Sequence, residues 1–354
     1  MKKSMHKAVT LLLSVSITLA SVLTGCGKEE VVSEDTAKET VVMTIEDHDV
    51  TLQEYYLYLI QYCYNNSVDP ASVTDEKKAE IISAVTEELK LETVEYILAD
   101  VTEDVVVSEN DLSGADTGTN NFYQHFGADF LGKYGIDKDC VKELFVKQKY
   151  IDALTKKALS DLAKDSKPGI EEDYGELTFH SIYYALFPSV EYDASGEPKR
   201  DVSGNAIPLG EKELAEQLKK ANEYRERALA GESMEELVKE YGIEAYSGME
   251  HNFEGAYVEE LNKAIENMEN GDISNVIATP AGFMIARMDN NNDEEYKAFL
   301  IDYLSQQGAQ NMLSTLQNNW CTAAGVGELT VDSAITDAID VKAICQEMKD
   351  KNLY

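Results

Sequence analysis

The chain has 354 residues and carries 31 Lys and Arg against 66 Asp and Glu, which gives a formal net charge of −35. This acidity excludes proteins that bind nucleic-acid phosphates or anionic lipid headgroups through Lys and Arg. Hydrophobic residues make up 44% of the chain, enough for packed cores, and the length predicts two or three domains.

The N-terminus predicts an export signal over residues 1–25. Three lysines precede an apolar run of about 16 residues, shorter than the roughly 20 residues of a transmembrane helix. The run ends in Leu23-Thr24-Gly25-Cys26, which resembles the bacterial lipoprotein signal. That resemblance implies a lipid anchor on Cys26 at the extracytoplasmic face of the cell membrane; an ordinary secretory signal is the alternative. The polar residues 26–40 predict a flexible tether.

The other cysteines, Cys63, Cys140, Cys321 and Cys345, are widely scattered. Their spacing matches no metal site, and the chain has no phosphate-binding or hydrolase motif, so the sequence predicts no metal and no cofactor. Four cysteines in an exported protein permit three sets of disulfide pairs, and buried free thiols are an equal alternative. The sequence does not choose among them.

Residues 41–168 predict a mostly helical domain. A short apolar strand at 41–45 leads to Thr51, which with Glu54 forms a capping box at the start of a tyrosine-rich helix. A longer helix is predicted over 74–98, where apolar residues recur at helical spacing.

The end of this domain is predicted from turn-forming residues. The polar stretch 108–121, rich in Gly, Ser, Thr, Asn and Asp, predicts a loop. Helices are predicted over 122–134 and 138–163. The segment 165–169 contains Pro168 and Gly169 and predicts the domain boundary, because proline and glycine together end a helix.

Residues 169–291 predict a second domain, and residues 292–354 predict a helix and tail that pack on the first. The β-branched and aromatic run Leu177–Phe187 is typical of a strand. A hairpin or long loop is predicted next, over 192–208. Helices are predicted over 211–230, from residue 233 onward, and over 258–268, and a strand pair over 273–276 and 282–288.

Four motifs stand in a fixed order in the second domain: His180-Ser181-Ile182, Gly231–Leu237, Glu254–Val258 followed by Leu261 and Gly271–Ser274, and Thr279–Ile285. Their order and spacing resemble the parvulin-type peptidyl-prolyl isomerases. The helices on either side, with the entry Val50–Tyr55, resemble foldase lipoproteins of the PrsA and SurA type.

This resemblance implies an α+β fold. It consists of a helical SurA/PrsA-like N-terminal module, a parvulin-like domain with a small antiparallel sheet covered by helices, and a C-terminal helical segment. The implied chemistry is rotation about X–Pro bonds, which is slow because amide resonance sets a barrier of about 18–20 kcal/mol. Such a catalyst needs an apolar pocket and polar groups, and no covalent intermediate.

The resemblance also implies the site residues. Catalytic roles fall on His180 and Thr279. The implied substrate groove is lined by Met249, Tyr257, Leu261, Phe283 and Met284. The family's second histidine falls on Met284, which offers no strong hydrogen bond. The family's loop with a Cys or Asp is shortened here.

The implied function is that of a foldase that assists unfolded or nascent secreted polypeptides, including X–Pro segments, with or without isomerase activity. The alternative is a catalytically inactive binding or scaffold lipoprotein of the same fold. A solute-binding lipoprotein, with two α/β lobes, is disfavoured by the helical first half.

Overall fold

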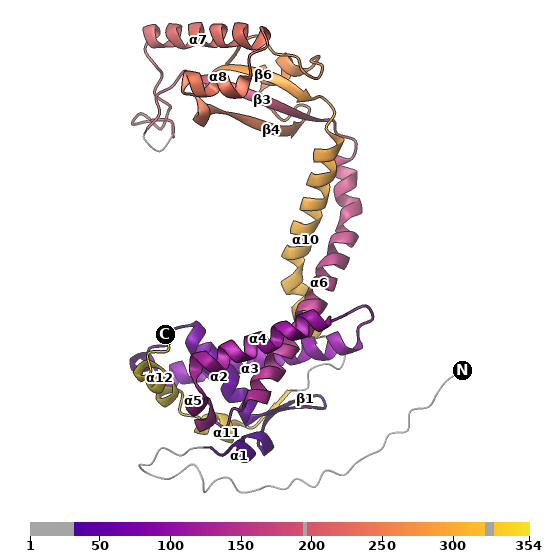
Figure 1. Ribbon diagram of the computed structural model, residues 1–354, viewed down its shortest axis with the longest axis vertical. Coiled ribbons are helices and arrows are strands. Elements are labelled where there is room, and N and C mark those ends of the chain that lie inside the picture. Colours follow the sequence, from indigo (N-terminus) through magenta and orange to yellow (C-terminus); the bar gives the residue numbers. More distant parts are fainter. Residues whose placement is uncertain (1–31, 194–196, 323–328) are drawn as a thin grey trace, which may run out of the picture. The chain divides into compact units, whose positions relative to one another are not determined.

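The computed structural model describes residues 32–193, 197–322 and 329–354 (Figure 1). Its mixture of long helices and small antiparallel sheets confirms the predicted α+β class. The chain divides into two compact units. Unit 1 combines the described residues up to Ala158 with Leu313–Tyr354, and unit 2 is Leu159–Met312. Within the described ranges, no helix combines the length and apolarity that crossing a membrane requires. Cys26 lies outside these ranges.

Unit 1 is a helical domain around a three-stranded sheet of order β2-β1-β7. Its elements are α1 (Glu34–Glu39), β1 (Val41–Ile45), β2 (His48–Thr51), α2 (Leu52–Asn65), a 3₁₀ turn (Pro70–Ser72), α3 (Asp75–Val101), α4 (Glu109–Phe126), α5 (Ala128–Lys133), β7 (Leu329–Val331), α11 (Ser333–Ala338) and α12 (Val341–Asp350). The tyrosine-rich helix α2 lies in the core, with Tyr55 fully buried. Strand β7 pairs with β1, so the end of the chain completes this unit.

Unit 2 is built on a four-stranded antiparallel sheet of order β4-β3-β6-β5. Its elements are β3 (Phe179–Pro188), α7 (Glu211–Leu229), α8 (Met234–Tyr241), a 3₁₀ turn (Glu244–Tyr246), β4 (Ser247–Phe253), α9 (Glu259–Ile265), β5 (Ile277–Thr279) and β6 (Gly282–Asn290). Helices α7 and α8 cover one face of the sheet and α9 covers the other. The predicted strand at 273–276 contributes one isolated bridge, from Ile273 to Arg287; β6 pairs with the later strand β5.

Two long helices each contribute residues to both units: α6 (Lys138–Tyr174) and α10 (Glu294–Thr322). The prediction that a helix ends at 165–169 is wrong, because α6 continues through Pro168. Proline removes one backbone hydrogen bond, but α10 supports the helix at this point. Lys167 forms an ion pair with Asp302 at 2.6 Å, and Ser166 Oγ donates to the Ser305 carbonyl at 3.4 Å.

The predicted loop at 108–121 is wrong as well, since these residues belong to α4. Ser108 and Asp111 form a capping box at its start. Gly118 allows close packing rather than a turn, because a Cβ there would lie 2.9 Å from the Phe145 ring on α6. Tertiary contact therefore outweighs the low helix propensity of this stretch.

The predicted tether is too long. Residues 34–39 form α1, which begins at the N-cap Ser33 and buries Ala37 completely. Lys38 forms an ion pair with Asp137 at 2.5 Å, which fixes α1 against the start of α6. Of the predicted tether 26–40, the part up to residue 31 lies outside the described residues.

Gly282 begins β6 with φ +152°, and a Cβ there would lie 2.2 Å from the Phe187 carbonyl oxygen on β3. We expect Gly282→Ala to lower the free energy of unfolding by about 2–4 kcal/mol, because the strands must separate locally. Urea denaturation followed by circular dichroism measures this. Gly248→Ala in β4 is the matched control, since no atom lies within 4 Å of its Cβ position. Equal effects of the two changes would refute the close approach.

Glu92 on α3 makes the stability of unit 1 depend on pH. Burial, together with the charges of Glu88 and Glu95, raises the pKa of Glu92 to about 7, although the Tyr58 hydroxyl donates to its carboxylate and Lys147 lies nearby. An unfolded Glu has a pKa of about 4.3. Between about pH 4.3 and pH 7 the folded protein therefore holds a proton that the unfolded chain releases, so stability falls as the pH rises through this window.

We expect the wild type to lose about 2 kcal/mol more stability than Glu92→Gln between pH 5 and pH 8, because glutamine carries no charge to bury. Fluorescence of Trp320, the chain's single tryptophan, which packs against the core of unit 1, monitors unfolding in urea. Parallel stability curves for the two proteins would contradict the assignment.

Candidate functional site

The central strand β3 divides its side chains between the two faces of the sheet, because successive residues point in opposite directions. Ala185 and Phe187 belong to the core beneath α7 and α8, whereas Ile182 belongs to the core beneath α9. Residues directly opposite one another in an antiparallel pair share a face. The register therefore assigns each residue of β4 and β6 to a face.

On the α9 side, partly exposed side chains lie beside an apolar core. We define the α9 face by these residues: Tyr184 and Leu186 of β3, Glu250 of β4, Met284 of β6, Tyr257 just before α9, and Leu261 of α9. Leu186 of β3 lies opposite Met284 of β6. Tyr184 and Leu186 are successive residues of β3 on this face. The strands thus hold polar and apolar groups side by side on a rigid sheet.

Tyr184 and Glu250 are the titratable pair of this face. Burial raises the pKa of the Glu250 carboxyl. Burial and the nearby charge of Glu250 raise the pKa of the Tyr184 hydroxyl, which stays protonated at neutral pH. Both side chains are partly exposed. The face therefore offers a hydroxyl donor and a carboxyl group above an apolar floor, an arrangement that can bind and polarise a peptide group without a covalent step.

The two predicted catalytic residues lie at opposite ends of the sheet. His180 is at the start of β3, whereas Thr279 is beside Gly282, which pairs with Pro188 at the end of β3. At about 3.3 Å per residue, eight residues separate them by about 26 Å. The structure does not bring this pair together.

Each of the two has a local role. His180 is buried, its Nδ1 has no hydrogen-bond partner, and its carbonyl oxygen accepts from the Tyr257 hydroxyl at 3.2 Å. The Thr279 hydroxyl donates to the Gly282 carbonyl at 2.9 Å and accepts from the Gly282 N–H at 3.2 Å. Thr279 thus closes the turn between β5 and β6.

The predicted groove residues fall on both faces. Tyr257, Leu261 and Met284 share the α9 face. Met249 lies opposite Tyr183, and Phe283 opposite Phe187, so both point to the side of α7 and α8. Because of strand alternation, these five residues cannot line one groove.

Sequence reasoning missed Tyr184 and Glu250. Alternation along β3 from the apolar Ile182 could have placed Tyr184 on the same face. Glu250 required the register of β4 against β3, where it lies opposite Ile182. That register depends on long-range pairing, which a motif does not reveal.

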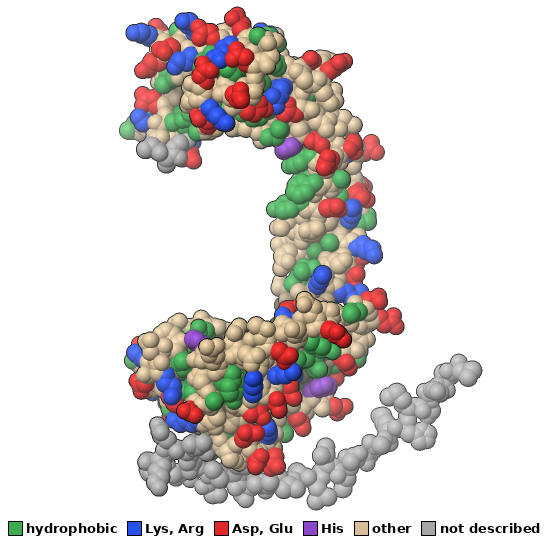
Figure 2. Space-filling model, viewed as in Figure 1, with side chains coloured by type: hydrophobic (Ala, Val, Ile, Leu, Met, Phe, Trp, Pro, Cys, Tyr) green, Lys and Arg blue, Asp and Glu red, His purple; other side chains and the backbone are tan. Residues whose placement is uncertain are grey.

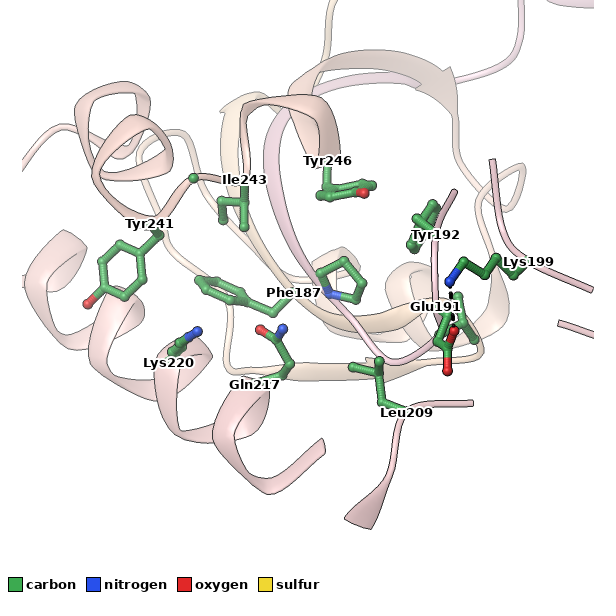
Figure 3. Close-up of a pocket in the computed structure, with 13 residues that line it drawn as sticks. Phe187, Glu191, Tyr192, Lys199, Leu209, Gln217, Lys220, Tyr241, Ile243 and Tyr246 are labelled. Atoms are coloured by element: carbon green, nitrogen blue, oxygen red, sulfur yellow. Dashed lines mark hydrogen bonds and ion pairs between the residues drawn. The ribbon is translucent and has the colours of Figure 1, made fainter. Parts of the chain in front are cut away.

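A cavity of about 380 Å³ lies on the other side of the sheet (Figure 3). Aromatic rings of Phe187, Tyr192, Tyr241 and Tyr246 line it, with Tyr192 and Tyr246 in contact at 4.7 Å between ring centroids. The Lys199–Glu191 ion pair, at 3.0 Å, lies at its edge. Since Phe187 points away from α9, this cavity is separate from the α9 face.

A polar cluster joins β3, β4 and the start of α10. Ser181 Oγ lies 2.5 Å from His251 Nδ1 and donates to the Asp293 carboxylate, and Asp293 Oδ1 accepts from the Tyr296 N–H at 3.0 Å. The Ser181 side chain is buried, and these contacts link β3 and β4 to the start of α10. Within the described ranges, no group of three or more His, Cys, Asp or Glu is arranged to hold a metal ion.

Residues 208–299 match the family model of the PPIC-type PPIASE domain. Unit 2 therefore carries a parvulin-type domain. The predicted resemblance is confirmed. The match includes β4, α9 and β6 of the α9 face and leaves out β3, which supplies Tyr184. Because β3 lies between β4 and β6 in the sheet, the domain in the structure includes a strand that the family model does not match.

Solved structures that match most of the chain include the foldase protein PrsA from Lactococcus lactis, with 11% identity, a TM-score of 0.40, and coverage of 84% of this chain and 96% of that one. PrsA from Streptococcus pneumoniae follows with 15% identity, a TM-score of 0.34, and coverage of 86% and 100%. A match from the structures of the SurA-like chaperones PEB4 and Cj1289 of Campylobacter jejuni has 10% identity, a TM-score of 0.26, and coverage of 83% and 100%. Comparison with curated protein sequences gave no match. The parvulin-type domain is assigned from the family match.

Proposed function

We propose that this protein is a foldase that binds unfolded polypeptides and catalyses cis–trans isomerisation of X–Pro bonds on the α9 face. The match of residues 208–299 to the PPIC-type domain carries this proposal. The geometry of the α9 face supports it, since the face combines an apolar floor with hydroxyl and carboxyl groups.

In this mechanism the apolar side chains of Leu186, Leu261 and Met284 hold the proline ring. This removes water from the amide, and a twisted amide is less polar than the planar ground state. The Tyr184 hydroxyl donates a hydrogen bond that becomes stronger as conjugation is lost. Glu250 orients the peptide segment beside it. No bond is made or broken, so the barrier of about 18–20 kcal/mol is lowered by binding the twisted state more tightly.

Tyr184→Phe tests the α9 face. We expect kcat/KM for a proline-containing peptide to fall about tenfold, the equivalent of one hydrogen bond, because the ring remains and the hydroxyl is lost. Met249→Ala is the matched control, since Met249 precedes Glu250 on β4 but points to the other face and is 52% exposed. A protease-coupled isomerisation assay measures both. An unchanged rate in Tyr184→Phe, with active wild-type protein, would remove the face from catalysis.

Client binding is proposed for one side of α10 within unit 2. The exposed side chains Phe299, Tyr303, Gln306 and Gln310 recur at helical spacing and define the client face. Phe299 is 60% and Tyr303 49% exposed, and their rings stack at 6.1 Å. From Tyr303 to its end at Thr322, α10 carries no charged residue. Figure 2 shows green and tan side chains along α10, with fewer red and blue ones than along α6.

The absence of charge is what suits this face to unfolded clients. A chain with a net charge of −35 repels acidic segments over most of its surface. An uncharged stretch accepts segments of either sign. The aromatic rings supply apolar contact area, and glutamine amides can pair with the backbone N–H and C=O groups of an extended peptide.

The double change Phe299→Ala and Tyr303→Ala tests the client face. We expect suppression of aggregation of an unrelated unfolded protein to weaken about threefold or more, since two large contact areas are lost. The isomerisation rate on a short peptide should not change. Leu229→Ala, at a side chain on α7 that is 53% exposed, is the control for loss of exposed apolar surface. Equal loss in both proteins would argue against a defined client face.

A catalytically inactive scaffold is the second candidate. Met284 favours it, because a thioether supplies no strong hydrogen bond at the centre of the α9 face. Because a scaffold holds one fixed partner, this candidate predicts that the wild type shows neither isomerisation nor suppression of aggregation of an unrelated unfolded protein. Loss of both activities would remove the foldase proposal altogether.

The last element of the proposal is a lipid anchor on Cys26 that holds the protein outside the cytoplasm. It is supported by the sequence around Cys26, where an apolar run ends in Leu-Thr-Gly-Cys. In the cells that produce it, the wild-type protein should incorporate labelled fatty acid and sediment with membranes. Cys26→Ala should do neither, because the acylated residue is gone. Membrane sedimentation of the Cys26→Ala protein, or no label in the wild type, would rule out this anchor.

A further inference from the structure

Two cysteines that are far apart in the sequence meet in the core of unit 1. Cys63 lies near the end of α2 and Cys345 in the middle of α12, and both are fully buried in the same hydrophobic cluster. Their thiols hydrogen-bond to each other. Neither residue belongs to unit 2, which contains the α9 face.

Hydrogen bonds and an ion pair near the two cysteines hold α12 and the residues after it against the segment that follows α2. The Tyr354 hydroxyl donates to the carbonyl oxygens of Cys345 and Val68, at 2.9 Å each. The Val68 N–H in turn donates to the Cys63 carbonyl at 3.0 Å. Lys349 and Asp69 form an ion pair at 3.0 Å. The chain that follows each of the two cysteines is thus held against the other segment.

The other two cysteines of the described chain have different surroundings. Cys140, on α6, lies near the charges of Glu54 and Asp137. Cys321, at the end of α10, lies near Lys90 and Glu95. Of the three sets of disulfide pairs that the sequence permits, one joins thiols that already touch.

We propose that Cys63 and Cys345 form an intramolecular disulfide under oxidising conditions, which covalently joins α12 to α2. The oxidant is a small-molecule disulfide such as oxidised glutathione, or a protein dithiol–disulfide oxidoreductase. The pair is a reversible modification site of unit 1. It does not depend on the proposed foldase activity.

The chemistry proceeds through two exchanges. Both thiols are fully buried, so the exchange starts from an open form of α12 in which Cys345 is exposed. When α12 opens, the Cys345 thiolate attacks the oxidised glutathione, forms a mixed disulfide and releases one glutathione thiolate. Cys63, deprotonated on the return of α12, attacks the Cys345 sulfur and releases the second. Two thiols lose two electrons and two protons, and one glutathione disulfide becomes two glutathione thiols.

The expected effect on stability is large, because the closed loop spans about 280 residues. A crosslink limits the freedom of the unfolded chain, and its effect grows with loop length. We therefore expect Tm of unit 1 to rise by about 10 °C on oxidation. Dithiothreitol should reverse the change.

The experiment refolds the purified protein from urea in a glutathione redox buffer, blocks free thiols and identifies crosslinked peptides by mass spectrometry without reduction. We expect a linked pair that contains Cys63 and Cys345, and a Tm that falls on reduction. Cys140→Ser and Cys321→Ser should keep both properties, whereas Cys345→Ser should lose both.

Two results would overturn the proposal. One is folded wild-type protein in which Cys63 and Cys345 both remain free after oxidation. The other is a dominant crosslink to Cys140 or Cys321. Both results are read from the wild type, so they do not depend on whether any variant folds.

Discussion

The pairing of β3 with β4 on one side and β6 on the other is the constraint on which unit 2 depends. Once this register is set, each side chain of the sheet must lie under α7 and α8 or under α9. A shift of one residue would exchange the two sets, so the side chains that pack beneath α7 and α8 would point to α9 and the reverse. The α9 face is therefore a consequence of the same pairing that builds the hydrophobic core.

The motifs of the sequence were sufficient to recognise the parvulin-type domain. In the structure, Tyr257 lies just before α9 and Leu261 within it, and both belong to the same core. The motif that contains His180 does not indicate how far along β3 this residue lies from Thr279. Tyr184, four residues later, is closer to Met284 in the sheet. Strand register is a long-range property, and a match of two or three residues does not determine it.

The helical errors have another origin. Local propensity alone predicts a loop around Gly118 and the end of a helix at Pro168. In the structure Gly118 makes room for Phe145, and Pro168 lies in a helix supported by α10. Both effects come from a second helix distant in sequence. Local patterns therefore predicted the N-cap at Thr51 and the start of a helix at residue 74 correctly. They missed the positions where contact with another helix stabilises the backbone.

Unit 1 is assembled from two stretches of chain that lie on either side of unit 2 in the sequence. Strand β7 and helix α12 are translated after unit 2, yet they complete the sheet and the core that begin with β1 and α2. All residues of unit 2 are synthesised before the final 42 residues of unit 1, Leu313–Tyr354, exist. The inserted unit can thus mature while its host is still incomplete, the reverse of the N-terminus-first order of ordinary tandem domains.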